Sequence, residues 1–387
     1  MSASNDDTDW GDDELVAPPI AKQDEPAKAP IVDDMEDPDE GFFDDLNTQE
    51  AIEGLPWEED EAEFDQPASF KMGIIGGRAA GKTYLFQAMA YRTINPRRAG
   101  VLTPFLAQSP PVVYHRTDQD TGDERLNVRD FLSEYREWRR LATTTVGVLH
   151  WYKLRLKTPC GFLGLGRANL DVESLDAPGE ALAGDYATYQ KMWHDAYIGA
   201  RVIIFTVPLW AVFPDQEMSD DNWLARERAL AEFHQVVHHY KNLREEAGET
   251  SRVRSVLALT MADDDRSELK AIRDRWIEPY RSGKYMRQLG YWTVARYLES
   301  ARMTSNALKE LFHDLPDQNL ASLPDELSIG GSSPWIVPVS SIDGQKLDEY
   351  QQTRRSGKQP RIKEPPRPVH VALPLLLALC ERDNALM

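Results

Sequence analysis

Short apolar runs alternate with amphipathic stretches along most of the chain. Residues 70–75 form an apolar run that ends at Gly76 and Gly77, and residues 83–91 then repeat apolar side chains at helical spacing. The same pattern predicts strands at residues 146–156, 168–175, 201–207, 254–260 and 335–339, helices at residues 187–197, 223–246 and 371–384, and a helix-rich stretch at residues 267–311. This alternation predicts an α/β fold with a mostly parallel sheet covered by helices on both faces.

The first 66 residues lack this pattern. They hold 24 acidic and two basic side chains, whereas the remaining 321 residues carry 40 acidic and 42 basic ones. A segment rich in Asp, Glu and Pro and poor in branched aliphatic residues cannot offset the entropy lost on ordering. We therefore expect a disordered acidic N-terminal tail at residues 1–66 and a folded domain at residues 67–387. The scattered aromatic residues of the tail either dock into a partner or belong to a solvated spacer.

Composition argues against several classes of protein. The longest apolar runs, residues 202–213 and 371–380, are shorter than the ~18–20 residues that cross a bilayer. No secretory signal is visible, and Cys160 and Cys380 are too far apart to suggest a structural zinc site or a disulfide framework. We therefore expect a cytoplasmic protein without a membrane span. The anionic tail and the near-neutral body argue against nucleic acid as a partner, because phosphates would be repelled rather than attracted.

Residues 76–83 read GGRAAGKT, a full match to the pattern GxxxxGK[ST]. In this pattern glycines let backbone N–H groups turn toward phosphate oxygens, Lys82 reaches the terminal phosphates, and the Thr83 hydroxyl can ligate magnesium at a helix start. The place of the match between an apolar strand and an amphipathic helix distinguishes it from an ordinary Gly-rich turn. It predicts a phosphate-binding loop made of Gly76, Gly77, Arg78, Ala79, Ala80, Gly81, Lys82 and Thr83.

A second motif, DAPG at residues 176–179, directly follows a predicted strand. A carboxylate such as Asp176 at the end of a strand beside the first one would hold magnesium, usually through water, and Gly179 would offer an N–H group to the terminal phosphate. The same four residues are also typical of an ordinary turn. The magnesium-binding interpretation therefore depends on the position of the motif, directly after a predicted strand.

Taken in order, these motifs resemble those of the Ras-like GTPases of the TRAFAC class, in particular large bacterial-type GTPases with insertions. The resemblance implies a three-layer P-loop NTPase fold, a Ras-like G domain, that binds GTP or GDP together with Mg²⁺. By the same resemblance Thr145 is the switch I threonine that contacts the metal, with Thr144 as the alternate. A polar lead into a strand of β-branched residues is the other interpretation of this segment.

The segments that would contact the base follow later in the chain. Thr260 and Asp263, in the sequence TMAD, resemble the family's base-reading motif, with Asp263 accepting hydrogen bonds from guanine. Ser340 and Ser341 resemble the loop whose backbone contacts the base oxygen. Met261 stands where the family has a lysine whose stem covers the base, although a methionine is also an apolar lid.

Residues for hydrolysis are less typical of the family. Glu180 occupies the position of the glutamine that orients the attacking water; it accepts a hydrogen bond from water but cannot donate one. Arginines that neutralise developing charge raise phosphoryl-transfer rates by about 10³–10⁵. Arg140, Arg139 and Arg78 are candidates for this role, and ordinary surface charges are the alternative for each.

The resemblance implies a Mg²⁺-dependent guanine-nucleotide switch that hydrolyses GTP slowly and acts on a protein partner. The partner would bind through the switch segments, the acidic tail or the expected helical insertions at residues 92–142, 264–334 and 342–369. Two alternatives stay open. One is an ATPase that uses the same loop, and the other is a nucleotide-binding scaffold that does not hydrolyse.

Overall fold

The structure is a computed structural model that describes residues 70–94, 111–117, 120, 122–136, 149–160, 166–176, 186–214, 218–263, 274, 293–342 and 368–383. All of them belong to one compact unit, residues 58–387. The predicted tail lies outside the described residues, and so do residues 267–273 and 275–292 of the predicted helix-rich stretch 267–311.

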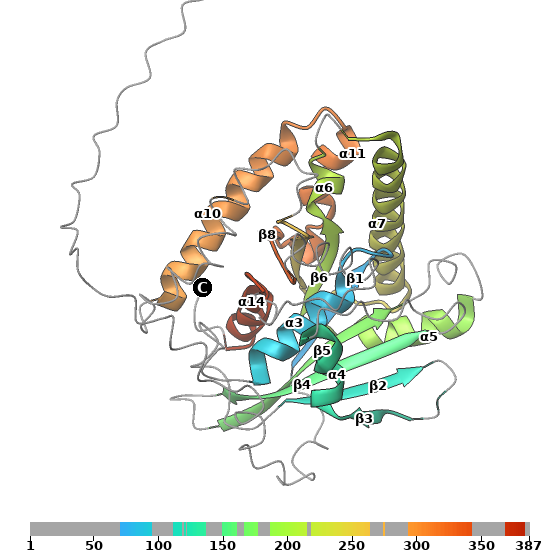
Figure 1. Ribbon diagram of the computed structural model, residues 1–387, viewed down its shortest axis with the longest axis vertical. Helices are drawn as coiled ribbons and strands as arrows, with labels where there is room; N and C mark the ends of the chain where they lie inside the picture. Colours follow the sequence, from blue (N-terminus) through green and yellow to red (C-terminus); the bar gives the residue numbers. More distant parts are fainter. Residues whose placement is uncertain are drawn as a thin grey trace, which may run out of the picture. The chain divides into compact units, whose positions relative to one another are not determined.

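A mixed sheet of eight strands runs through the described part of the chain (Figure 1). Its strand order is β3-β2-β4-β5-β1-β6-β7-β8. The strands are β1 (Phe70–Gly76), β2 (Val112–Thr117), β3 (Glu124–Leu126), β4 (His150–Cys160), β5 (Gly166–Asp176), β6 (Val202–Pro208), β7 (Arg254–Thr260) and β8 (Trp335–Pro338).

Only one half of this sheet is parallel. Strands β5, β1, β6, β7 and β8 pair in parallel, whereas β3, β2, β4 and β5 pair antiparallel. The prediction of a mostly parallel sheet was therefore wrong for this second half. The five residues between β4 and β5 are too few for a crossover, because parallel neighbours need a connection of about a dozen residues or more. The expected helical insertion at residues 92–142 also contributes strand β2 and the edge strand β3.

Helices cover both faces of the sheet, as predicted. They are α3 (Lys82–Ile94), α4 (Val128–Arg136), α5 (Tyr186–Tyr197), α6 (Leu209–Val212), α7 (Asp220–Glu246), α10 (Thr293–His313), α11 (Gln318–Ala321), α12 (Leu323–Glu326) and α14 (Ala372–Asp383), with a 3-10 turn at Ile329–Gly331. Neighbouring residues Ile74 and Ile75 of β1 enter different hydrophobic clusters, because successive side chains of a strand point to opposite faces.

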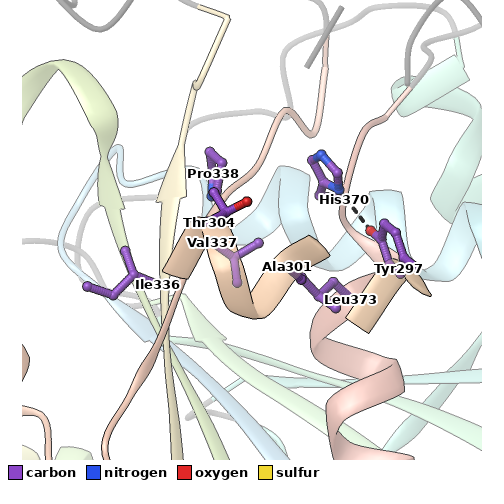
Figure 2. Close-up of a pocket in the computed structure, with 8 residues that line it drawn as sticks. All are labelled: Tyr297, Ala301, Thr304, Ile336, Val337, Pro338, His370 and Leu373. Atoms are coloured by element: carbon purple, nitrogen blue, oxygen red, sulfur yellow. Dashed lines mark hydrogen bonds between the residues drawn. The ribbon is translucent and has the colours of Figure 1, made fainter. Parts of the chain in front are cut away.

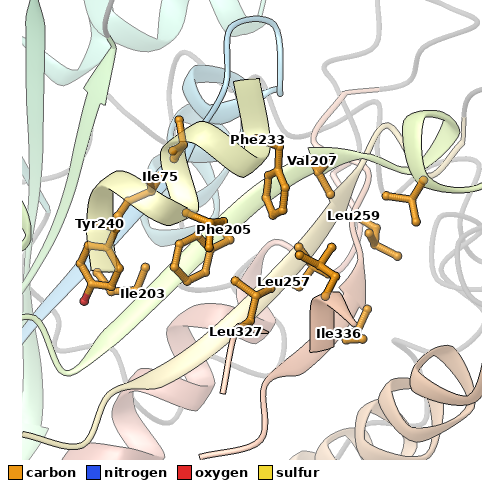
Figure 3. Close-up of a cluster of buried hydrophobic side chains, with 14 of the residues drawn as sticks. Ile75, Ile203, Phe205, Val207, Phe233, Tyr240, Leu257, Leu259, Leu327 and Ile336 are labelled. Atoms are coloured by element: carbon orange, nitrogen blue, oxygen red, sulfur yellow. The ribbon is translucent and has the colours of Figure 1, made fainter. Parts of the chain in front are cut away.

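The two clusters assign the helices to layers. Helices α3, α4 and α14 contribute to the cluster that contains Ile74, and α5, α6, α7, α11 and α12 to the cluster that contains Ile75, while α10 contributes to both. Figure 3 shows Phe233 and Tyr240 of α7 beside strand residues of the second cluster. The result is an α/β fold with helices on both sides of its sheet, consistent with the fold of P-loop NTPases. No helix in the described ranges is long and apolar enough to cross a membrane.

Candidate functional site

The loop after β1 lies where the strand order reverses. Strand β1 pairs with β5 on one side and β6 on the other. After β1 the chain forms α3 on one face, and between β5 and β6 it forms α5 on the opposite face. In open α/β sheets, ligands bind beyond the carboxyl ends of strands at such a reversal. The GGRAAGKT segment therefore occupies the position where a ligand site is expected in this sheet.

The backbone of this loop turns tightly into a helix. Ala79 and Gly81 have positive φ angles of 55° and 77°, and alternating backbone conformations of this kind turn successive N–H groups to one side. The first turn of α3 closes with a bond from Leu85 N to Gly81 O of 2.9 Å. The loop thus leads directly into the positive end of a helix, which favours an anion.

Lys82 is the first residue of α3 and is only 5% exposed. Its Nζ atom donates a hydrogen bond of 2.8 Å to the Gly77 carbonyl oxygen. A lysine is rarely this buried unless its charge has partners. The structure therefore brings the ammonium group of Lys82 back over the loop.

Two threonines from neighbouring strands hold the loop. Thr206 in β6 donates to the Ile75 carbonyl oxygen at 3.2 Å, and a Cβ atom on Gly76 would lie 2.0 Å from Thr206 Oγ1. Thr260, at the end of β7, donates to the Ala80 carbonyl oxygen at 2.9 Å. Thr260, expected near the base, thus contacts the loop itself. Thr206 was missed, although it is the one hydroxyl side chain in an otherwise apolar strand.

The segments after β7 and β8 run side by side. Ala262 N donates to the Val339 carbonyl oxygen at 3.2 Å. Met261 has a positive φ of 53°, which turns the chain sharply before Asp263, a residue only 3% exposed. The two predicted base-reading segments are therefore adjacent in space, on the β7 side of the loop.

The predicted serines are buried at the end of β8. Ser340 is fully buried, Ser341 is 6% exposed, and Ser341 Oγ has no hydrogen-bond partner among the described residues. The hydroxyl of Tyr135 donates to the Ser341 carbonyl oxygen at 2.5 Å. Burial raises the pKa of Tyr135 well above its usual value, so this hydroxyl remains a donor. Tyr135 belongs to α4, and no sequence signal connected it with this loop.

The predicted metal ligands are only partly described. Thr83 is the second residue of α3, and Asp176 is the last residue of β5, the strand next to β1. Thr145, Arg140, Gly179 and Glu180 lie outside the described residues. Within the described ranges no group of three or more His, Cys, Asp or Glu side chains could hold a metal. The residues in place fit a phosphate group, and for magnesium they supply Thr83 and the position of Asp176.

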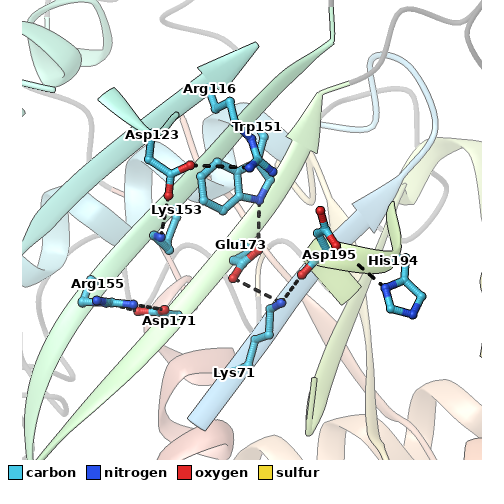
Figure 4. Close-up of polar contacts among 10 residues, drawn as sticks. All are labelled: Lys71, Arg116, Asp123, Trp151, Lys153, Arg155, Asp171, Glu173, His194 and Asp195. Carbon is cyan, nitrogen blue, oxygen red and sulfur yellow. Dashed lines mark hydrogen bonds and ion pairs between the residues drawn. The ribbon is translucent and has the colours of Figure 1, made fainter. Parts of the chain in front are cut away.

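A separate polar network lies on the sheet at β1, β4 and β5 (Figure 4). Arg155 donates two hydrogen bonds of 2.6 Å to the Asp171 carboxylate. The Glu173 carboxylate accepts from Trp151 Nε1 at 2.9 Å and lies 3.3 Å from Lys71 Nζ. Burial raises the pKa of Glu173 to about 7, although Lys71 opposes this shift. These partners satisfy one another, and none of them belongs to the predicted site.

A small pocket lies elsewhere, between α10, β8 and the start of α14 (Figure 2). Its lining residues are Tyr297, Ala301, Thr304, Ile336, Val337, Pro338, His370 and Leu373. The Tyr297 hydroxyl and His370 Nδ1 are hydrogen-bonded at 2.8 Å. No residue of the GGRAAGKT loop lines this pocket, so it is distinct from the candidate site.

Comparisons with known proteins give little more. No protein family matches the sequence, and no curated protein matches it. Among solved structures, the chain is similar to one from the "Signal recognition particle receptor SRb-GTP/SRX complex" of Chaetomium thermophilum, with a TM-score of 0.29 and 14% identity. The match covers 60% of this chain and 87% of that chain.

Proposed function

We propose that this chain binds a guanine nucleotide together with Mg²⁺ at the GGRAAGKT loop and hydrolyses GTP slowly. One observation carries the proposal: Lys82 is buried at the start of α3 with its ammonium group on the loop, at the point where the strand order reverses. A buried cation beside backbone N–H groups and a helix start is suited to a polyphosphate.

The residues around the loop have separate roles in this proposal. Lys82 keeps one N–H of its ammonium group on the Gly77 carbonyl oxygen and donates the others to oxygens of the terminal phosphates. Thr83, Asp176 and Thr145 hold the metal, which neutralises charge on the phosphates when it is bound. The N–H group of Gly179 completes the contacts to the terminal phosphate.

Hydrolysis would depend on a residue that orients the attacking water and on an arginine. Glu180 accepts a hydrogen bond from the attacking water. Arg140, or Arg78 at the exposed tip of the loop, neutralises charge that develops on the transferred group. Because Glu180 cannot donate a hydrogen bond, we expect slow turnover.

Base recognition would use the two adjacent segments after β7 and β8. Asp263 accepts hydrogen bonds from guanine, and the backbone at Ser340 and Ser341 contacts the base oxygen. Met261 covers the base with its apolar side chain. In this proposal the chain is a Ras-like GTPase of the TRAFAC class whose segments near Thr145 and Gly179 change order with the terminal phosphate, and a protein partner reads that change.

The test is a titration of the purified chain with GTP and ATP in the presence of Mg²⁺, together with identification of any nucleotide that copurifies. We expect Lys82→Ala to weaken GTP binding by about 10- to 100-fold, since hydrogen bonds to charged groups contribute ~1.5–3 kcal/mol. The control is Lys191→Ala, which removes an exposed lysine on α5. The proposal fails if the wild-type chain has no nucleotide affinity or if both variants bind equally well.

Met261 favours a second candidate, an ATPase that uses the same loop, because the lysine typical of guanine sites is missing. Tighter binding of ATP than of GTP would select this candidate. A third outcome, nucleotide binding without phosphate release in a single turnover, would indicate a scaffold rather than a hydrolase.

A further inference from the structure

One peptide group of the loop is held from both sides. The Gly77 carbonyl oxygen accepts from Lys82 Nζ at 2.8 Å, and the N–H of the same peptide, at Arg78, donates to Glu232 Oε2 at 2.7 Å. The C=O and N–H of a trans peptide point in opposite directions. The Lys82 ammonium group and the Glu232 carboxylate therefore lie on opposite sides of this peptide.

Glu232 is presented to the loop by a firmly packed helix. It is a half-buried residue in α7, and its neighbour Phe233 is 1% exposed in the hydrophobic cluster beneath the helix. A Cβ atom on Gly77 would lie 3.0 Å from Glu232 Cβ and 3.1 Å from Glu232 Oε2. An alanine at residue 77 would therefore require Glu232 or the loop to shift by a few tenths of an ångström.

The two bonds reinforce each other. Both are charge-assisted, and a donor at one end of a peptide and an acceptor at the other polarise it in the same sense. A glycine next to this peptide allows it to rotate when one partner is lost, because glycine has few steric limits. The Glu232 carboxylate thus restrains a peptide group that the flanking Gly77 would otherwise allow to rotate.

We propose that Glu232 is a positioning residue of the phosphate loop. Its carboxylate fixes the Gly77–Arg78 peptide with the carbonyl toward Lys82, and so keeps the ammonium group where it meets the terminal phosphates. This inference rests on the proposed nucleotide binding at the same loop. Through the Glu232 side chain, helix α7 positions the Lys82 ammonium group for the phosphates.

The experiment compares Glu232→Ala, Glu232→Gln and the control Glu245→Ala, an exposed carboxylate on the same helix. Binding of Mg²⁺–GTP and Mg²⁺–GDP to the full chain is measured by calorimetry, and thermal unfolding without nucleotide shows that each variant is folded. We expect Glu232→Ala to weaken binding of both nucleotides about 5- to 20-fold. Glu232→Gln keeps an acceptor for the Arg78 N–H group and should stay within about threefold of wild type.

A double-mutant cycle separates positioning from a general effect on stability. If Glu232 acts through Lys82, Glu232→Ala should add little to the loss caused by Lys82→Ala. Additive losses would overturn the inference. Tighter GTP binding by Glu232→Ala and Glu232→Gln would also overturn it, because the carboxylate would then act by repelling phosphate.

The outcomes also separate this inference from the proposed function. A wild-type chain that binds no nucleotide would refute the proposed function and the inference together. A wild-type chain that binds, with Glu232→Ala at unchanged affinity, would refute the inference alone.

Discussion

Replacing Gly76 by alanine tests how closely the loop approaches β6. The added Cβ atom would lie 2.0 Å from Thr206 Oγ1 and 2.7 Å from the Thr206 backbone oxygen. The hydroxyl can rotate away, but it then loses its bond to the Ile75 carbonyl oxygen. The backbone contact cannot be relieved in this way, so β1 and β6 must separate locally by about 0.7 Å to reach an ordinary contact of 3.4 Å.

The expected cost follows from three terms. Overpacking a buried site costs about 1–3 kcal/mol, and the lost hydrogen bond of Thr206 adds about 0.5–1.5 kcal/mol. The smaller conformational entropy of the unfolded alanine variant returns about 0.4–1 kcal/mol. The free energy of unfolding should therefore fall by about 2 kcal/mol, within limits of roughly 0.5 and 4 kcal/mol.

Equilibrium unfolding in urea measures this change. The matched control is Gly122→Ala, because a Cβ atom at Gly122 meets nothing within 4 Å. We expect the control to be as stable as the wild-type chain or slightly more stable. Adding Thr206→Ala to Gly76→Ala should recover only part of the loss, since the backbone contact remains. Equal midpoints for Gly76→Ala and Gly122→Ala would refute the close approach of loop and strand.

Two further predictions concern the polar network on the sheet. The pKa of Glu173, raised to about 7 from 4.5, means that the folded chain holds a proton that the unfolded chain releases between these pH values. The stability contributed by this proton is complete below about pH 4.5 and is lost as the pH rises through 7. The Glu173→Gln variant keeps an acceptor for Trp151 but cannot titrate. Between pH 4.5 and 8 the free energy of unfolding of the wild-type chain should fall by about 3 kcal/mol relative to that of this variant. The prediction is contradicted if the free energies of unfolding of the two chains change in parallel with pH over this range. Arg155→Ala leaves the buried Asp171 carboxylate without its partner and should cost about 3–5 kcal/mol in urea unfolding, whereas the pair Arg155→Met and Asp171→Leu should cost less. A double variant less stable than the single one would contradict this order.

Local pattern was sufficient for most elements of the fold. Strand β7 begins and ends where the apolar run predicts, at Arg254–Thr260, and β1, β6, β8, α5 and α14 differ from prediction by no more than one residue at either end. An apolar run and the glycine or polar residues that bound it are neighbours in the sequence. The bounds of such a strand or helix can therefore be predicted without knowledge of the rest of the fold. Pairing direction is not local, and the short link between β4 and β5 was the overlooked signal for an antiparallel pair.

In the candidate site, too, some features could be predicted from the sequence and others only from the tertiary structure. The spacing of Gly76, Lys82 and Thr83 follows from the geometry of one loop and one helix start, and the sequence alone determined where a phosphate is expected. The side chains that hold that loop come from far along the chain: Glu232 is 154 residues from Arg78, and Thr260 is 180 residues from Ala80. These contacts depend on the order in which strands pair and on the face that each helix covers. Only the tertiary structure decided them, because periodicity records which side chains are buried but not which distant ones meet.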